Sequence, residues 1–335
     1  MQDTKDDNLN AGDAIAMAEL THNFVQTNGI RMHYVEQGAG PAVIMCHGWP
    51  ESWYSWRHQI AALSEAGYRV IAPNQRGYGQ TDAPAPIESY NIFNLTGDIV
   101  GLVNALGIKS ATIIGHDWGA AVAWYSALLR PDLFHSIALL SVPYGPRTPM
   151  RPTDEMKEIA GDGNFYQLYF QEPGKVEKEL DADARRSVMM ILYSASGDPP
   201  PAEQWRFIFG RNEKFIETGV VPKTLPKWLT EKDVEFYAGE FKRAGFRGGI
   251  NWYRNLDRNW EMTPFLDGAM LRQPSIFIAG EHDAVLKMYP PALDAVDATM
   301  TGLRKKVVIP GAGHWIQQER PNEVDRLLIE FLKGL

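Results

Sequence analysis

The residues with the most chemical potential lie in one short turn, Gly115-His116-Asp117-Trp118-Gly119, directly after the apolar run 111–114. A strand, a glycine-flanked turn and an alanine-rich helix form the context of a nucleophile elbow, in which serine ordinarily holds the third position. Here that position holds Asp117. The turn by itself leaves a second interpretation open, because aspartate is also a common helix N-cap.

A carboxylate at an elbow favours displacement at a saturated carbon. A serine that attacked such a carbon would form an ether, which is hard to hydrolyse. Asp117 would instead form an ester, which a histidine and a water molecule can open again. The carboxylate needs no deprotonation, because the positive end of the following helix favours its ionised form. The predicted chemistry is therefore alkylation of Asp117 followed by hydrolysis.

Partners for this nucleophile stand later in the chain, in the order acid and then histidine that such a sheet requires. His314 lies in a glycine-rich loop before the last predicted helix, and it alone among eight histidines occupies a loop of the right order and type. The acid is either Asp283 or Glu281, which share the loop after the run 275–279. We favour Asp283 because it lies later in that loop.

A third loop, His47-Gly48-Trp49-Pro50, follows another apolar run. Gly48 allows the backbone to approach the elbow. The backbone N–H groups of Trp49 and Trp118 are predicted to form an oxyanion hole. The Trp49–Pro50 bond is a candidate for the cis form. An ordinary structural turn is the alternative interpretation of this loop when it is considered alone.

The elements that position these loops alternate between strands and helices. The pattern predicts strands at 30–36, 41–46, 69–72, 111–114, 135–142, 275–279 and 305–309, and helices at 52–66, 94–106, 118–129 and 321–332. Such alternation predicts an α/β protein with a mostly parallel sheet covered on both faces.

The alternation stops near residue 145, where a segment rich in aromatic, proline and charged residues begins. This segment contains helical patterns at 181–193 and 231–244 and no convincing strand. The expected organisation is an N-terminal tail (1–21), a first part of the core (22–144), a helical lid (145–268) and a second part of the core (269–335).

Composition limits the possible partners, cellular compartment and cofactors. The 335 residues are 44% apolar with a net charge of -8, and no basic stripe suits nucleic acid. The single cysteine, Cys46, cannot form an internal disulfide and lies in an apolar run, so we expect a buried thiol and a reducing compartment. No apolar run reaches membrane-spanning length and no secretory signal is evident, so we expect a cytoplasmic protein without membrane contact. Neither metal-ligand spacing nor a dinucleotide fingerprint is present, and we expect no metal and no organic cofactor.

Together these motifs resemble the α/β-hydrolase fold, and within it the soluble epoxide hydrolases of animals and plants without the phosphatase domain that some carry. The resemblance rests on the three loops described above, on His314-Trp315, and on two segments of the lid, FYQLYFQEPG (165–174) and NWYRNLDRNW (251–260). It covers nearly the whole chain from about residue 22.

The resemblance implies that Tyr166 and Tyr253 hold the epoxide oxygen. An epoxide opens to a basic alkoxide that needs a proton, and a phenol is protonated at neutral pH. Tyr169 is the alternative if Tyr166 points away. The residues expected to bind substrate are Trp118, Phe165, Gln167, Trp252 and Trp315.

The expected reaction converts an epoxide and water into a vicinal diol, in a monomer or homodimer. The nearest alternative is a haloalkane or haloacid dehalogenase with the same Asp–His–Asp apparatus, because a halide leaves without a proton. A serine-type esterase is disfavoured by Asp117 itself. A non-catalytic protein that binds a small ligand is a further alternative, which loss of a triad residue or lid tyrosine would support; none is lost here.

Overall fold

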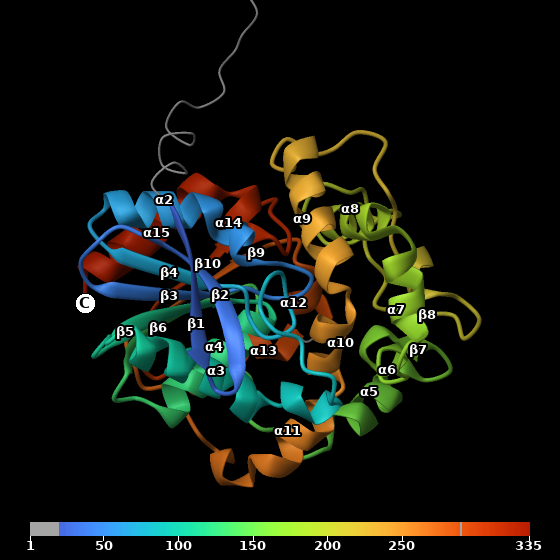
Figure 1. Cartoon of the computed structure of the whole chain (residues 1–335). Coiled ribbons are helices and arrows are strands. Elements are labelled where there is room, and N and C mark those ends of the chain that lie inside the picture. The colour runs from blue at the N-terminus through green and yellow to red at the C-terminus, as the bar shows by residue number, and fades with distance from the viewer. Residues whose placement is uncertain (1–19, 289) are drawn as a thin grey trace, which may run out of the picture.

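The computed structural model describes residues 20–288 and 290–335, so residues 1–19 of the predicted tail lie outside the described residues. An eight-stranded sheet has the order β1-β2-β4-β3-β5-β6-β9-β10 (Figure 1). β2 is antiparallel to β1 and to β4, and the other neighbours are parallel. In chain order the strands are β1 (Thr21–Thr27), β2 (Ile30–Gln37), β3 (Ala42–Cys46), β4 (Arg69–Pro73), β5 (Ala111–His116), β6 (Phe134–Leu140), β9 (Ser275–Gly280) and β10 (Leu303–Ile309). The predicted fold class is confirmed.

Helices cover both faces of this sheet (Figure 1). On one side lie α2 (Arg57–Glu65), α14 (Ile316–Glu319) and α15 (Pro321–Lys333), and on the other lie α3 (Ile92–Ala105), α4 (Trp118–Leu129) and α13 (Pro290–Thr299). Every residue of β3 and β5 is therefore buried, which explains why β3 is entirely apolar and β5 is mostly so. Cys46, in β3, is buried as predicted.

The parallel strands bring the chemically important loops to one edge. β3, β5, β9 and β10 run in the same direction, so the loops after their carboxyl ends meet at the same side of the sheet. These loops carry Trp49, Asp117, Asp283 and His314 in that order.

A mostly helical segment between β6 and β9 forms a cap beside that edge (Figure 1). Its helices are α5 (Pro152–Ala160), α6 (Tyr166–Tyr169), α7 (Lys175–Leu180), α8 (Ala184–Ser194), α9 (Glu231–Ala244), α10 (Arg247–Tyr253) and α11 (Leu256–Met262). It also contains one antiparallel pair of two-residue strands, β7 (Asn164–Phe165) and β8 (Ile208–Phe209). The sequence pattern missed this pair, because two residues are too few to show alternation.

Two other differences have local causes. β1 was not predicted, since it is an edge strand whose sequence, THNFVQT, is mostly polar and mostly exposed. The helix predicted at 52–66 is divided into a 3-10 turn, Trp53–Trp56, and the α-helix α2. Ser52 does cap the start of that turn, because its hydroxyl accepts the N–H of Tyr54.

Candidate active site

Asp117 lies at a strained turn between β5 and α4, with φ 53° and ψ -124°. Such a positive φ is uncommon for a residue with a side chain and is typical of functional turns. Crowding explains the flanking glycines: a Cβ on Gly115 would overlap the carbonyl oxygen of Gly119, and a Cβ on Gly119 would overlap the carbonyl oxygen of Cys46. The side chain of Asp117 makes no capping hydrogen bond to its helix, which argues against a simple N-cap.

The loop after β3 supplies a donor to this carboxylate. The backbone N–H of Trp49 donates to Asp117 Oδ1 at 2.8 Å. Gly48 makes the approach possible, because a Cβ there would overlap the Asp117 side chain. The Trp49–Pro50 peptide bond is cis. This geometry brings Trp49 and Asp117 together as an oxyanion hole requires.

His314 lies between two carboxylates. Its Nδ1 is 3.0 Å from Asp283 Oδ1, and its Nε2 is 3.4 Å from Asp117 Oδ2. Glu281, the competing acid, instead accepts the N–H of Gly311 at the surface. The structure therefore brings Asp117, His314 and Asp283 together in the arrangement of a nucleophile, a base and an orienting acid.

The two charges at the centre stabilise each other. Burial raises the pKa of Asp117, but the hydrogen bond and positive charge of His314 outweigh that effect and hold the pKa below its usual value. Burial lowers the pKa of His314, but Asp283 and Asp117 together raise it well above its usual range. In this state Asp117 is an anion and His314 carries a proton on each ring nitrogen.

The cap contributes two phenols to the same place. Tyr166 and Tyr253 lie with ring centroids 5.9 Å apart, and both line a cavity with Asp117 and His314. Burial and the nearby Tyr166 and Asp117 raise the pKa of Tyr253 well above its usual value, so this phenol keeps its proton. Tyr169 points elsewhere, because its hydroxyl donates to Glu179 Oε1 at 2.5 Å.

The cavity is small, with a volume of about 10 Å³. That space suits about one water molecule. Its wall is formed by Trp49, Asp117, Tyr166, Ile191, Ala195, Trp205, Tyr253, Val285, His314 and Trp315. Four of these were missed from the sequence: Ile191, Ala195, Trp205 and Val285. No periodic pattern or motif singles them out, although the ring of Trp205 packs edge-on against Tyr166 at 4.7 Å.

Of the residues expected to bind substrate, Trp315 lies on the cavity wall. Its ring N–H donates to the carbonyl oxygen of Leu192 at 2.7 Å, which fixes the indole against the cap. Trp118 packs edge-on against Tyr253 at 5.1 Å and against Trp252 at 5.9 Å. Trp118 and Trp252 thus lie behind Tyr253.

The other two expected residues contact the second phenol. Phe165 packs against the Tyr166 ring with centroids 5.3 Å apart, and Gln167 Nε2 donates to the Tyr166 hydroxyl oxygen at 2.7 Å. The Tyr166 oxygen accepts in that contact and keeps its own proton for a second partner. Phe165 and Gln167 therefore hold Tyr166 in place from behind.

Neither a metal centre nor a membrane span is found in the described part of the chain. Residues 20–288 and 290–335 contain no group of three His, Cys, Asp or Glu side chains that could hold a metal ion. None of the helices placed in those ranges is sufficiently long and apolar to cross a membrane.

Comparison with known proteins gives a consistent result. Residues 41–175 match the family described as alpha/beta hydrolase fold. Epoxide hydrolase A of Mycobacterium tuberculosis is 46% identical over 324 residues, which are 95% of this chain and 99% of that protein. Epoxide hydrolase 2 of Siraitia grosvenorii is 40% identical over the same shares of the two chains.

Solved structures agree in both sequence and shape. An epoxide hydrolase from an endophytic Streptomyces is 46% identical with a TM-score of 0.91, covering 94% of this chain and 96% of its own. Epoxide hydrolase A from Mycobacterium thermoresistibile is also 46% identical, with a TM-score of 0.89 and coverages of 94% and 99%. With identities this high over nearly the full length, the chain belongs to the epoxide hydrolase family of the α/β-hydrolase fold.

Proposed function

We propose that this protein converts an epoxide and water into a vicinal diol through an ester of Asp117. One observation carries the proposal: a nucleophilic carboxylate, a histidine paired with a second carboxylate, and two phenols converge on a single cavity. The core supplies Asp117 and His314, and the cap supplies Tyr166 and Tyr253. The substrate therefore lies between the two parts of the fold.

In the first step, Asp117 Oδ2 attacks an epoxide carbon. The N–H of Trp49 holds Oδ1, which makes Oδ1 the oxygen that stays as the ester carbonyl. The carbon–oxygen bond of the ring breaks, and the departing alkoxide takes a proton from Tyr166 or Tyr253. The products of this step are an alkyl ester at Asp117, a free hydroxyl on the substrate and one phenolate.

Ester formation also prepares the base. Alkylation removes the negative charge of Asp117, one of the two carboxylates that raise the pKa of His314. The imidazolium then gives a proton to the phenolate, which restores both phenols and leaves a neutral imidazole. The first step thus creates the base that the second step needs.

In the second step, neutral His314 takes a proton from water, and the hydroxide attacks Cγ of Asp117. The negative charge develops on Oδ1, where Trp49 N–H already donates and the N–H of Trp118 is the proposed second donor. Collapse expels the diol oxygen, which takes a proton from His314. The acid proton left on Asp117 passes to His314, and the resting charges are restored.

Substrate contacts are proposed for five further side chains. Trp315 forms part of the wall, and Trp118 and Trp252 support the wall behind Tyr253. Phe165 and Gln167 act beside Tyr166.

A trapping experiment tests the proposal. His314→Gln removes the base but leaves Asp117 able to attack, so incubation with styrene oxide is expected to raise the intact mass by one epoxide. Peptide mapping is expected to place the added mass on Asp117. Asp117→Asn in the same background is the matched control and should show no adduct. Diol production by His314→Gln at the wild-type rate, without an adduct, would contradict the mechanism.

The two phenols favour an epoxide over an alkyl halide as the substrate, since a departing halide needs no proton donor. The non-catalytic alternative is disfavoured because the triad and both lid tyrosines are present and meet at one cavity.

The cellular setting is part of the proposal. We place the protein in the cytoplasm, as a monomer or homodimer that takes a small epoxide and water and has no nucleic-acid or membrane partner. Its net charge of -8 supports the absence of a nucleic-acid partner, because a negative surface repels phosphates. Cell fractionation and light scattering of the purified protein test location and oligomeric state.

A further inference from the structure

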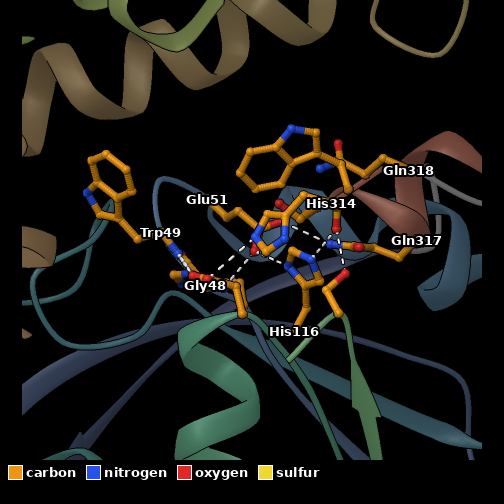
Figure 2. Close-up of polar contacts among 12 residues, drawn as sticks. Gly48, Trp49, Glu51, His116, His314, Gln317 and Gln318 are labelled. Carbon is orange, nitrogen blue, oxygen red and sulfur yellow. Dashed lines mark hydrogen bonds and ion pairs between the residues drawn. The ribbon is translucent and has the colours of Figure 1, made fainter. Parts of the chain in front are cut away.

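A second carboxylate–imidazole pair lies next to His314 of the catalytic triad (Figure 2). Glu51, in the loop after β3, and His116, the last residue of β5, approach to 2.7 Å between Oε2 and Nδ1. Glu51 is 1% exposed and His116 is fully buried. Neither residue lines the cavity described above, and the mechanism proposed above does not use either one.

Each residue of this pair contacts a different loop of the active site. His116 Nε2 lies 2.7 Å from the backbone carbonyl oxygen of His314. A carbonyl oxygen only accepts, so Nε2 carries a hydrogen and donates it. Ser141 Oγ donates to the same carbonyl at 2.6 Å. The backbone of the catalytic histidine is thus held by two buried side chains.

Glu51 holds the loop that contains Gly48 and Trp49. Its Oε2 accepts the backbone N–H of Gly48 at 2.7 Å, and its Oε1 accepts Gln317 Nε2 at 2.9 Å (Figure 2). Gly48 is joined directly to Trp49, whose N–H reaches Asp117 Oδ1. The carboxylate therefore fixes the turn that presents the oxyanion donor.

The hydrogen bonds also favour a charged Glu51. Glu51 accepts two N–H groups besides that of His116, and acceptance of N–H groups favours an ionised carboxylate. Burial raises the pKa of Glu51, but the charge and hydrogen bond of His116 outweigh it, so the pKa lies below its usual value. His116 donates from Nε2 to the carbonyl of His314 and faces the Glu51 carboxylate with Nδ1, so both ring nitrogens have a buried partner.

We propose that Glu51 and His116 are positioning residues for ester hydrolysis, because together they fix the backbone of His314 and the Gly48–Trp49 turn relative to Asp117. This inference rests on the proposed function. Buried ion pairs contribute little net stability compared with apolar side chains of the same size, so stability alone gives little reason for this pair.

The pair should affect the two chemical steps unequally. Alkylation uses the Asp117 carboxylate and the phenols of the cap, and no hydrogen bond of Glu51 or His116 reaches either tyrosine. Hydrolysis requires His314 to aim a water at Cγ and Trp49 to stabilise the charge on Oδ1. Both requirements depend on backbone that the pair holds.

Glu51→Gln is the first test, because it preserves size and removes the charge. Oε2 of Glu51 bonds both Gly48 and His116 while Oε1 accepts from Gln317, so an amide, which has only one acceptor oxygen, cannot keep all three bonds. Rapid-quench mass spectrometry under single-turnover conditions measures how fast the ester forms and how fast it decays. We expect decay to slow by about 100-fold and formation to change by less than about 3-fold, since small misplacements of reacting groups cost this much.

A double-mutant cycle separates the pair from general damage. His116→Gln leaves the Glu51 charge buried without its partner, whereas Glu51→Gln combined with His116→Gln removes the charge together with its partner. The double variant should therefore hydrolyse the ester faster than the product of the two single effects predicts. Ser141→Ala is a milder variant that removes only the second donor to His314, and it should slow decay by about 3-fold to 10-fold.

The matched control is Asp98→Asn, which breaks another buried ion pair, Arg76–Asp98, with atoms 2.6 Å apart. It should lower stability in urea without changing the ratio of ester formation to decay. Equal losses in both steps for Glu51→Gln and Ser141→Ala, or unchanged decay in both, would overturn the inference. Failure of the wild-type protein to form any ester would instead overturn the proposed function.

Discussion

Replacement of both lid phenols by phenylalanine provides the sharpest test of how the epoxide oxygen is handled. Tyr253 is 2% exposed, and its ring packs edge-on against Trp118, Trp49 and Phe170. Tyr253→Phe therefore removes a hydroxyl and leaves the packing in place. Tyr166 is 4% exposed and its ring is held by Trp205, so the same holds for Tyr166→Phe.

The expected loss in the rate of ester formation follows from the environment of the two phenols. A buried donor aimed at charge that develops in the transition state contributes about 3 kcal/mol, or about 100-fold in rate. Each single variant keeps one phenol and should lose about that factor. The double variant has no proton donor for the alkoxide, and its loss in ester formation should reach at least about 10⁴-fold.

The assay uses the His314→Gln background, in which the ester accumulates even when it forms slowly. Adduct mass is followed over time with an epoxide and with an alkyl iodide of the same carbon skeleton. Iodide leaves without a proton, so alkylation by the iodide should be nearly insensitive to loss of Tyr166 and Tyr253. Rapid epoxide opening by the double variant, or equal losses for both reagents, would refute the assignment of the phenols as proton donors.

Other predictions concern the nucleophile, its loop and a buried acid. Gly48→Ala should abolish ester formation, since its methyl group would overlap Asp117; mass spectrometry of the His314→Gln form detects this. Because His314 depresses the pKa of Asp117, ester formation should persist to a lower pH than the titration of an ordinary aspartate allows, and rapid-quench mass spectrometry of the wild-type protein after a pH jump measures this limit. Burial raises the pKa of Glu319 from 4.5 to about 7. The folded state therefore binds this proton more tightly than the unfolded chain, so the resulting stability is complete below pH 4.5 and lost as pH rises through 7. Glu319→Gln should remove a decline of about 3 kcal/mol between pH 4.5 and 8 in urea unfolding, and an unchanged decline would contradict this.

The sheet and the elbow could be predicted because their signals are local. The buried strand β3 is an unbroken apolar run, β5 is mostly apolar, and the glycines around Asp117 stand within two residues of it. β1 could not be predicted from the sequence pattern, because an exposed edge strand needs no apolar run. Only its pairing with β2 defines it as a strand.

The cavity wall could not be predicted in the same way. Trp205 belongs to the irregular stretch before β8, and its position against Tyr166 results from how the cap folds back on itself. Spacing also left Asp283 and Glu281 as alternatives. Their distinction depends on where the loop after β9 meets the loop after β10, which is a long-range contact.

The small cavity above Asp117 has a consequence for turnover. A space of about 10 Å³ accommodates a single solvent molecule but no organic ring, so side chains of the wall must separate before an epoxide reaches the nucleophile. When the wall opens without substrate, aromatic rings such as those of Trp205 and Trp315 become exposed to water, which is unfavourable. A bulky apolar substrate offsets that cost by covering the same rings, whereas a small polar substrate cannot. The free-energy cost of opening the cavity should therefore make the enzyme prefer apolar epoxides.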